Sequence, residues 1–176
     1  MTSALLSIGL LLSTSCGPIP CGAAPVADEV YLAAPAPVTA ESGESDIVSE
    51  AMAYLGVRYR LGGASREHGV DCANLVRLVF RDERGLDLPW SASELFRQGE
   101  TVPQESLRPG DLVFFKNTYK RGISHVGLYI GDGRFVHAAS RRRGVVVSEL
   151  ASPYYRAHYA GARRIVESGA AVVAGS

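Results

Sequence analysis

The sequence predicts an α+β fold, in which helices come first and an antiparallel sheet of about five strands follows. Apolar residues recur at helical spacing before residue 100, and short apolar runs separated by turn residues fill the rest of the chain. Of the 176 residues, 47% are apolar and 20% are charged, which suits one globular domain and excludes global disorder and fibrous repeats. We place this domain at residues 44–167.

Caps and glycine stops mark three helices. Asp71 is a candidate N-cap for an apolar helical pattern that Gly85 stops, which puts Cys72 on the first turn. Ser91 follows Pro89 and can cap the next helix. The predicted helices cover residues 45–54, with Ser45 or Asp46 as the cap, 72–84 and 92–98. The first helix would turn Ile47, Ala51 and Tyr54 to one face.

The strands begin after a turn at Pro109-Gly110. Residues 59–63 before the second helix are expected to form a loop that closes in a glycine pair. The predicted strands cover residues 112–115, 126–130, 134–138, 145–147 and 160–166. Because these strands follow one another without intervening helices, we expect an antiparallel meander.

Residues 1–21 resemble an export leader. Their apolar run at residues 4–12 is too short to span a bilayer but fits a secretory signal. Small residues precede Cys16, as in a bacterial lipidation signal; the alternative is an unlipidated leader in which Cys16 and Cys21 are paired or free. We therefore expect an exported protein of the cell envelope or periplasm that touches the membrane only through a lipid on Cys16. Residues 22–43, rich in Ala and Pro, predict a flexible linker, and residues 168–176 a disordered tail.

The charge balance argues against a nucleic-acid partner, because 18 Lys and Arg residues equal 18 Asp and Glu residues. Three cysteines are too few for a disulfide-rich scaffold. All 18 bases nevertheless lie from Arg58 onward, together with 12 acids. The predicted domain is therefore mildly cationic, which would attract an anionic polymer; a solvated Arg-rich surface is the alternative.

Cys72 is the candidate nucleophile, since it is the only cysteine in the predicted domain. The partial positive charge at a helix N-terminus lowers the pKa of a thiol, and the unpaired N–H groups there can hold an oxyanion. The plainer alternative is a small buried cysteine.

A thiolate nucleophile needs a base, and His125 and His137 are the candidates. They lie on hairpin partners, so the register decides whether their rings can meet. A three-residue loop would pair Gly127 with His137 and put both histidines on one face. A two-residue Asp132-Gly133 turn would put them on opposite faces, unless a bulge at the glycines restores the register.

A metal site is the weaker interpretation of the same residues. Cys72, His125 and His137 could form a three-ligand zinc set, but the sequence has no short-range ligand pair. We therefore predict neither a metal nor another cofactor. His68 and His158 are expected only to satisfy their own hydrogen bonds.

Several motifs in order resemble the NlpC family of papain-like cell-wall peptidases. They are Tyr54-Leu55-Gly56-Val57-Arg58-Tyr59-Arg60-Leu61-Gly62-Gly63, Asp71-Cys72, Leu88-Pro89, Arg108-Pro109-Gly110-Asp111-Leu112-Val113-Phe114-Phe115, Ser124-His125-Val126-Gly127-Leu128-Tyr129-Ile130-Gly131, Phe135-Val136-His137-Ala138 and Ala162-Arg163-Arg164. The resemblance covers nearly the whole predicted domain and implies the papain-like fold, with the nucleophile helix packed on the sheet.

The resemblance also implies roles. Cys72 would be the nucleophile, His125 the general base and acid, and His137 the group that orients His125. Tyr59 would lie near the oxyanion. Asp71 and Arg60 are further oxyanion or substrate candidates, and the Arg triplet at 141–143 could meet a substrate carboxylate, although a solvated loop is the favoured interpretation of that triplet.

The implied function is an exported, monomeric cysteine endopeptidase that cuts amide bonds in the stem peptides or cross-links of bacterial peptidoglycan through a thioester. The chain departs from the family pattern at Ala73-Asn74 and at Trp90. A wall-binding module of weak or no activity and a thioester-forming acyltransferase therefore stay open as alternatives.

Overall fold

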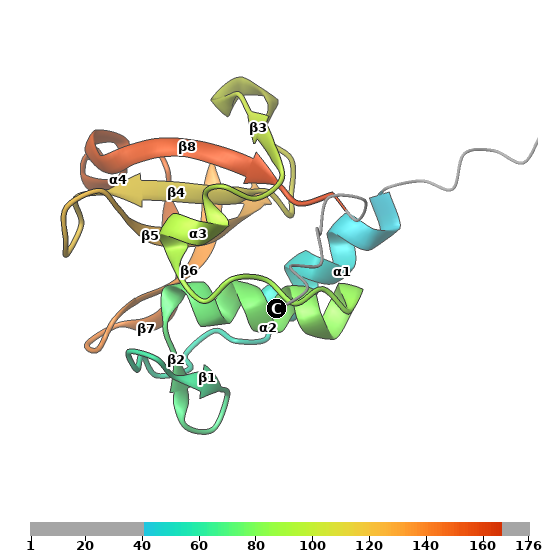
Figure 1. The fold of residues 1–176 in the computed structure, drawn as a ribbon, viewed down its shortest axis with the longest axis vertical. Helices are drawn as coiled ribbons and strands as arrows, with labels where there is room; N and C mark the ends of the chain where they lie inside the picture. The colour runs from blue at the N-terminus through green and yellow to red at the C-terminus, as the bar shows by residue number, and fades with distance from the viewer. Residues whose placement is uncertain (1–40, 167–176) are drawn as a thin grey trace, which may run out of the picture. The chain divides into compact units, whose positions relative to one another are not determined.

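The computed structural model describes residues 41–166. The predicted leader with Cys16 and Cys21, most of the predicted linker and the predicted tail lie outside the described residues. The helices are α1 (Glu41–Met52), α2 (Cys72–Arg84), α3 (Ala92–Leu95), the 3-10 turn η1 (Gln104–Ser106) and α4 (Pro153–His158). The strands are β1 (Ala64–Ser65), β2 (Gly69–Val70), β3 (Glu100–Val102), β4 (Leu112–Lys116), β5 (Ile123–Gly131), β6 (Arg134–Ser140), β7 (Gly144–Glu149) and β8 (Tyr159–Arg164). The predicted α+β class is confirmed, but the order is not strictly helices then strands: β1 and β2 precede α2, and α4 lies between β7 and β8 (Figure 1).

The main sheet has six antiparallel strands in the order β3-β8-β4-β5-β6-β7. Five of them are the predicted strands, lengthened by a residue or more except at the C-terminal end of β8. The sixth, β3, was not expected and pairs with β8 at the edge. β4 to β7 form the predicted meander, but β8 crosses back to pair with β4 (Figure 1).

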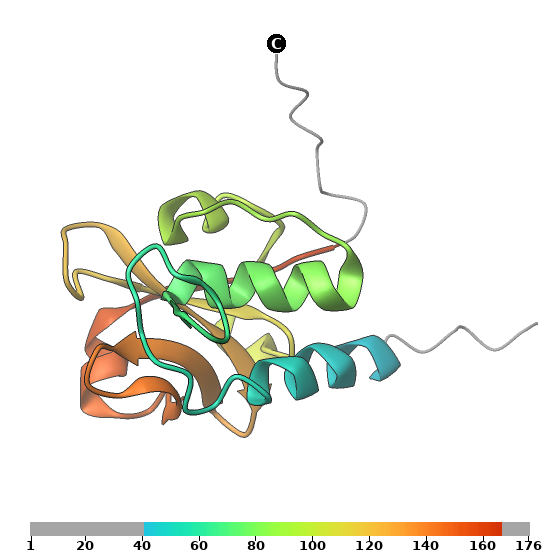
Figure 2. The same ribbon diagram turned by 90° about the horizontal axis from the view of Figure 1, so that it is seen from below.

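α1 and α2 pack together and cover one face of the sheet, as Figure 2 shows from below. The predicted apolar face of α1 is buried there, since Ile47, Ala51 and Tyr54 are at most 3% exposed. Alternate residues of β4, such as Leu112 and Phe114, belong to this core, while Val113 and Phe115 belong to a second core on the opposite face. A strand buried on both sides needs the unbroken apolar run seen in the sequence.

Three predicted helix boundaries are wrong. α1 begins at Glu41, so Ser45 and Asp46 lie inside the helix rather than at its cap position, and it ends at Met52 rather than at residue 54. α3 ends at Leu95 rather than at residue 98.

The predicted loop at residues 59–63 precedes the short β1–β2 ribbon. A Cβ on Gly63 would lie 2.4 Å from the carbonyl oxygen of Gly69, so this close approach requires glycine.

A buried ion pair ties the last strand to the start of β4. Arg164 donates from Nε and Nη2 to the two carboxylate oxygens of Asp111, both at 2.8 Å. Asp111 is 1% exposed, and Oδ2 also accepts the backbone N–H of Arg108. This pairing fixes β8 against the start of β4.

The space around Gly127 in the β5–β6 hairpin is too small for a side chain. A Cβ there would lie 2.5 Å from Cδ2 of Phe135 and 3.2 Å from Cβ of His137. We predict that Gly127→Ala lowers the free energy of unfolding by about 1–3 kcal/mol, because the added methyl group overpacks the buried ring of Phe135, which has little room to shift. Urea unfolding checks this. Gly133→Asn is the matched control, since Gly133 has open space around it and a φ of +70° that Asn tolerates; equal losses in both variants would contradict the packing argument.

Candidate active site

Asp71 organises the start of α2. It caps the helix as predicted: Oδ1 accepts the backbone N–H of Asn74 at 2.9 Å. Oδ2 accepts the backbone N–H of Gly62 at 2.8 Å, so both carboxylate oxygens are engaged. Asp71 thereby holds the loop that carries Tyr59 against the helix N-terminus.

Cys72 follows this cap and is buried as a free thiol. The backbone N–H groups of Val126, Ala73 and Cys72 itself face its sulfur and favour the thiolate. Burial, helped by the charge of Asp71, nevertheless outweighs them and raises the pKa of the Cys72 thiol to about 11. The expectation of a lowered thiol pKa is therefore wrong, because the helix terminus acts on a sulfur that has lost its water.

The register question at the β5–β6 hairpin is answered by a bulge. The hairpin closes with a two-residue Asp132-Gly133 turn, and the register then shifts within β5 before the ladder continues. The pairs are Gly131 with Arg134, then Tyr129 with Phe135 and Leu128 with Val136. The bulge restores the register of the three-residue loop, so the predicted placement of His125 and His137 on one face is confirmed.

The two imidazole rings are hydrogen-bonded. Nε2 of His125 lies 2.7 Å from Nδ1 of His137. On its other side, Nε2 of His137 lies 3.0 Å from the Ser148 hydroxyl oxygen and 3.2 Å from the Tyr155 hydroxyl oxygen. Both rings are buried, and each of the three ring nitrogens in these contacts has a hydrogen-bond partner, as buried polar groups require.

Burial keeps both histidines neutral. It lowers the pKa of His125 to about 4. It lowers the pKa of His137 to about 2; the charge of Arg143 acts in the same direction, as does His125 once acid has protonated it. At neutral pH the site therefore holds a protonated thiol and two neutral imidazoles.

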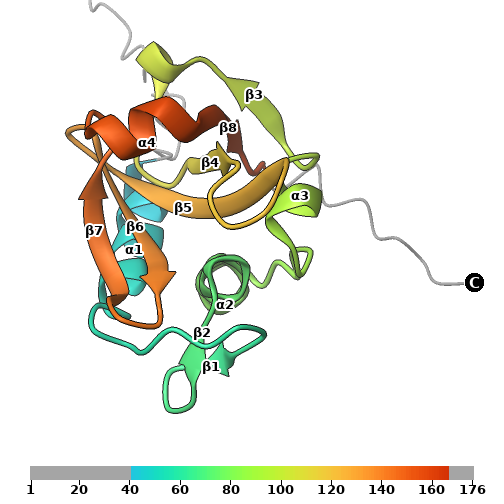
Figure 3. The ribbon, with the colours of Figure 1, turned by 90° about the vertical axis from the view of Figure 1, so that its left-hand side faces the viewer.

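Two cavities open beside these groups. One of about 180 Å³ is lined by Cys72, Asp71 and Tyr59, and another of about 110 Å³ by His125 and Tyr155. Tyr119, from the β4–β5 loop, lines both. Figure 3 looks onto this end of the fold, with α2 seen end-on beneath β5. Burial raises the pKa of Tyr59 to about 12, so its hydroxyl stays a hydrogen-bond donor near the thiol.

The predicted arginines lie at the edge of the site rather than among its buried groups. Arg60 is exposed, and its backbone N–H donates to the carbonyl of Val70. Arg141 and Arg143 lie close enough to influence the pKa values of Tyr59 and His137, respectively.

Within residues 41–166 no group of three or more His, Cys, Asp or Glu side chains is arranged to hold a metal ion. The helices of the same segment include none that could cross a membrane.

Sequence reasoning missed Ser148, Tyr155 and Tyr119. Ser148 could have been found from the β6–β7 register: it lies two residues beyond Val146, the partner of His137, and so shares the face of that ring. Tyr155 lies on α4, which the sequence analysis did not predict, and Tyr119 lies in a hairpin loop.

Comparison with known proteins gives a consistent result. Residues 56–164 match the NlpC/P60 family. The chain is 44% identical over 129 residues to gamma-DL-glutamyl hydrolase of Bacillus subtilis, covering 72% of this chain and 31% of that protein. It is 42% identical over 125 residues to the murein DD-endopeptidase MepS/murein LD-carboxypeptidase of Escherichia coli, covering 70% and 63%. The chain thus spans less than two thirds of the length of these two relatives.

Solved structures agree. An NlpC/P60 family protein from Bacillus cereus matches with a TM-score of 0.64 and 34% identity, over 69% of this chain and 39% of that chain. The peptidoglycan hydrolase RipB of Mycobacterium tuberculosis matches with a TM-score of 0.61 and 26% identity, over 72% and 66%.

The lowered pKa values predict acid sensitivity. Below the ordinary histidine pKa of about 6.5, His125 and His137 become protonated in the unfolded chain but stay neutral in the folded protein, where they are buried. The free energy of unfolding is therefore highest above that pH and decreases as the pH falls toward the folded pKa values. We predict that His137→Gln reduces the pH dependence of the free energy of unfolding by about 1.4 kcal/mol per pH unit in this window. Urea unfolding at a series of pH values checks this, and identical slopes would contradict a neutral, buried His137.

Proposed function

Since the chain belongs to the NlpC/P60 family, we propose that it is a cysteine endopeptidase that hydrolyses amide bonds in the stem peptides or cross-links of bacterial peptidoglycan. The observation that carries the proposal is the buried hydrogen bond between His125 and His137. Val126, which follows His125 in β5, directs its backbone N–H toward the Cys72 thiol. A base held in one orientation, on the strand whose backbone meets a thiol at a helix N-terminus, suits nucleophilic catalysis.

In the proposed reaction His125 acts as a neutral general base. As the sulfur of Cys72 attacks the amide carbonyl, the thiol proton passes to Nδ1 of His125. The S–C bond forms, the proton moves on to the amine, and the C–N bond breaks to leave a thioester. Water then gives a proton to His125 as its oxygen attacks the thioester carbonyl and forms the C–O bond. The S–C bond breaks, the acid product leaves, and the proton on His125 returns to the sulfur.

His137 fixes the tautomer of His125 that these proton transfers require. If Nδ1 of His125 accepts the proton, then Nε2 of His125 must carry one and donate it to Nδ1 of His137. Nε2 of His137 in turn donates to the hydroxyl oxygen of Ser148 or Tyr155. The backbone N–H groups that face the sulfur, together with the Tyr59 hydroxyl, are placed to stabilise the oxyanion.

The substrate also gives the expected location, because peptidoglycan lies in the cell envelope. Residues 1–21 would supply export, and a lipid on Cys16 would supply the membrane anchor.

Product analysis in plain water separates hydrolysis from acyl transfer, since only hydrolysis yields a free carboxylate without an added amine or alcohol.

We predict that Cys72→Ala abolishes product release from purified peptidoglycan, because no other group forms the thioester. Mass spectrometry of the soluble fragments measures this, with circular dichroism confirming the fold. The matched control is the double variant Cys16→Ala, Cys21→Ala, which removes cysteines outside the proposed domain and should keep wild-type turnover in soluble protein. Wild-type release by Cys72→Ala would refute the proposal.

The two histidines should differ in importance. His125→Ala is expected to lower turnover by about 10³-fold or more, because proton transfer is lost. His137→Gln should keep a measurable fraction, since an amide oxygen can accept the His125 N–H. In both wild type and His137→Gln, kcat/KM should fall only well below the ordinary histidine range, because burial lowers the pKa of His125 to about 4 and the base works only when neutral. A milder effect of His125→Ala than of His137→Gln would reverse the assigned roles.

A further inference from the structure

Trp90 is the only tryptophan of the chain, and it lines the cavity beside Cys72. It is 64% exposed, which is unusual for the largest apolar side chain of a globular domain. The exposed side chains of Leu61 and Tyr119 line the same cavity from two other segments of the chain. Exposed apolar groups gathered around one opening indicate a binding surface rather than chance exposure.

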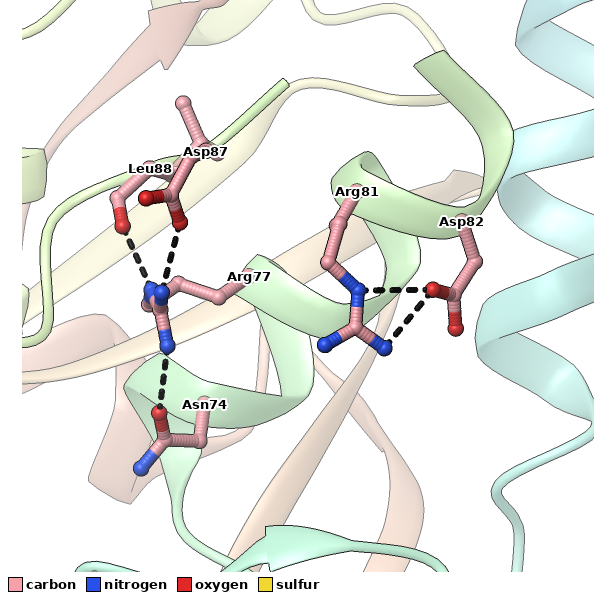
Figure 4. Close-up of polar contacts among 6 residues, drawn as sticks. All are labelled: Asn74, Arg77, Arg81, Asp82, Asp87 and Leu88. Carbon is pink, nitrogen blue, oxygen red and sulfur yellow. Dashed lines mark hydrogen bonds and ion pairs between the residues drawn. The ribbon is translucent and has the colours of Figure 1, made fainter. Parts of the chain in front are cut away.

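Arg77 holds the tryptophan ring in place. The guanidinium carbon lies 3.4 Å from the centre of the Trp90 ring, so the two planes are in stacking contact. The Arg77 side chain is only 11% exposed, and its three nitrogens are all engaged. They donate to the carbonyl of Leu88, to Oδ1 of Asn74 at 3.3 Å and to Oδ1 of Asp87 at 2.6 Å (Figure 4).

The two departures from the family pattern are therefore parts of one structure. Asn74 is 2% exposed on the first turn of α2 and anchors Arg77, and Arg77 carries the ring of Trp90. With one face covered by a guanidinium that is fixed on α2, the ring offers its exposed surface at the rim of the cavity. A ring that is already ordered loses little conformational freedom when a ligand binds.

The proposed chemistry determines which part of a substrate would meet Trp90. The leaving amine must receive its proton from His125, so the leaving side belongs in the cavity lined by His125. The acyl side then belongs in the cavity lined by Cys72 and Trp90. Tyr119 lines both cavities and lies where the scissile bond would cross.

We propose that Trp90 is a specificity-determining residue: a rigid platform that binds the aliphatic groups of the stem-peptide residues on the acyl side of the scissile bond. This inference rests on the proposed function. Because Trp90 contacts the substrate away from the reacting atoms, its contribution falls on substrate binding rather than on the chemical step.

The single tryptophan makes a direct test possible. Full-length Cys72→Ala protein is titrated with a purified stem tetrapeptide while tryptophan emission is recorded. The expected result is a saturable change in emission, because the only fluorescent indole lies in the contact. Isothermal calorimetry on the same pair measures binding independently; binding without any change in emission overturns the inference.

Kinetics of active variants give the second arm. Trp90→Ala should raise KM at least tenfold with kcat within threefold, and Trp90→Phe should lie between Trp90→Ala and wild type. Leu55→Ala is the matched control: it removes an exposed apolar side chain that lines neither cavity and should keep wild-type KM. Hydrolysis by wild type with an unchanged KM in Trp90→Ala overturns the Trp90 inference alone. Saturable binding without hydrolysis by wild type overturns the proposed function alone, and absence of both overturns both.

Discussion

A 2.7 Å hydrogen bond between two buried imidazole rings is the constraint on which the site depends. It requires that His125 and His137 share one face of the β5–β6 hairpin, and the register bulge before the turn provides this. It also requires partners on the outer side of His137, which Ser148 and Tyr155 supply. Without those hydroxyls, a ring nitrogen would be buried unpaired, at a cost of about 1–3 kcal/mol.

Burial decides the protonation state of the whole site. The N–H groups at the start of α2 favour a thiolate, yet desolvation wins and keeps Cys72 protonated, while the same effect keeps both histidines neutral. Because Cys72, His125 and His137 carry no charge at rest, the site avoids the cost of burying an ion pair among them. In the proposed reaction, charge develops only when the sulfur attacks, and the N–H groups and the Tyr59 hydroxyl would then stabilise it.

Local chemistry was predictable from the sequence, and tertiary detail was not. Asp71 and Ser91 cap their helices as expected, because capping depends on residues three positions apart. The bulge could only be stated as a condition, since the glycines at 131 and 133 allow either register. The raised thiol pKa, the contact of Tyr155 with His137 and the stacking of Trp90 on Arg77 escaped prediction because each depends on how distant segments pack.

The central claim is that His125 and His137 both stay neutral in the folded protein, while the Cys72 thiol stays protonated. ¹⁵N NMR of the histidine rings in the full chain, followed with pH, tests it most directly. The account predicts that both rings stay neutral well below the ordinary histidine pKa of about 6.5, with the proton on Nε2 in each. An imidazolium at His125 at neutral pH, or a proton on its Nδ1, would contradict it.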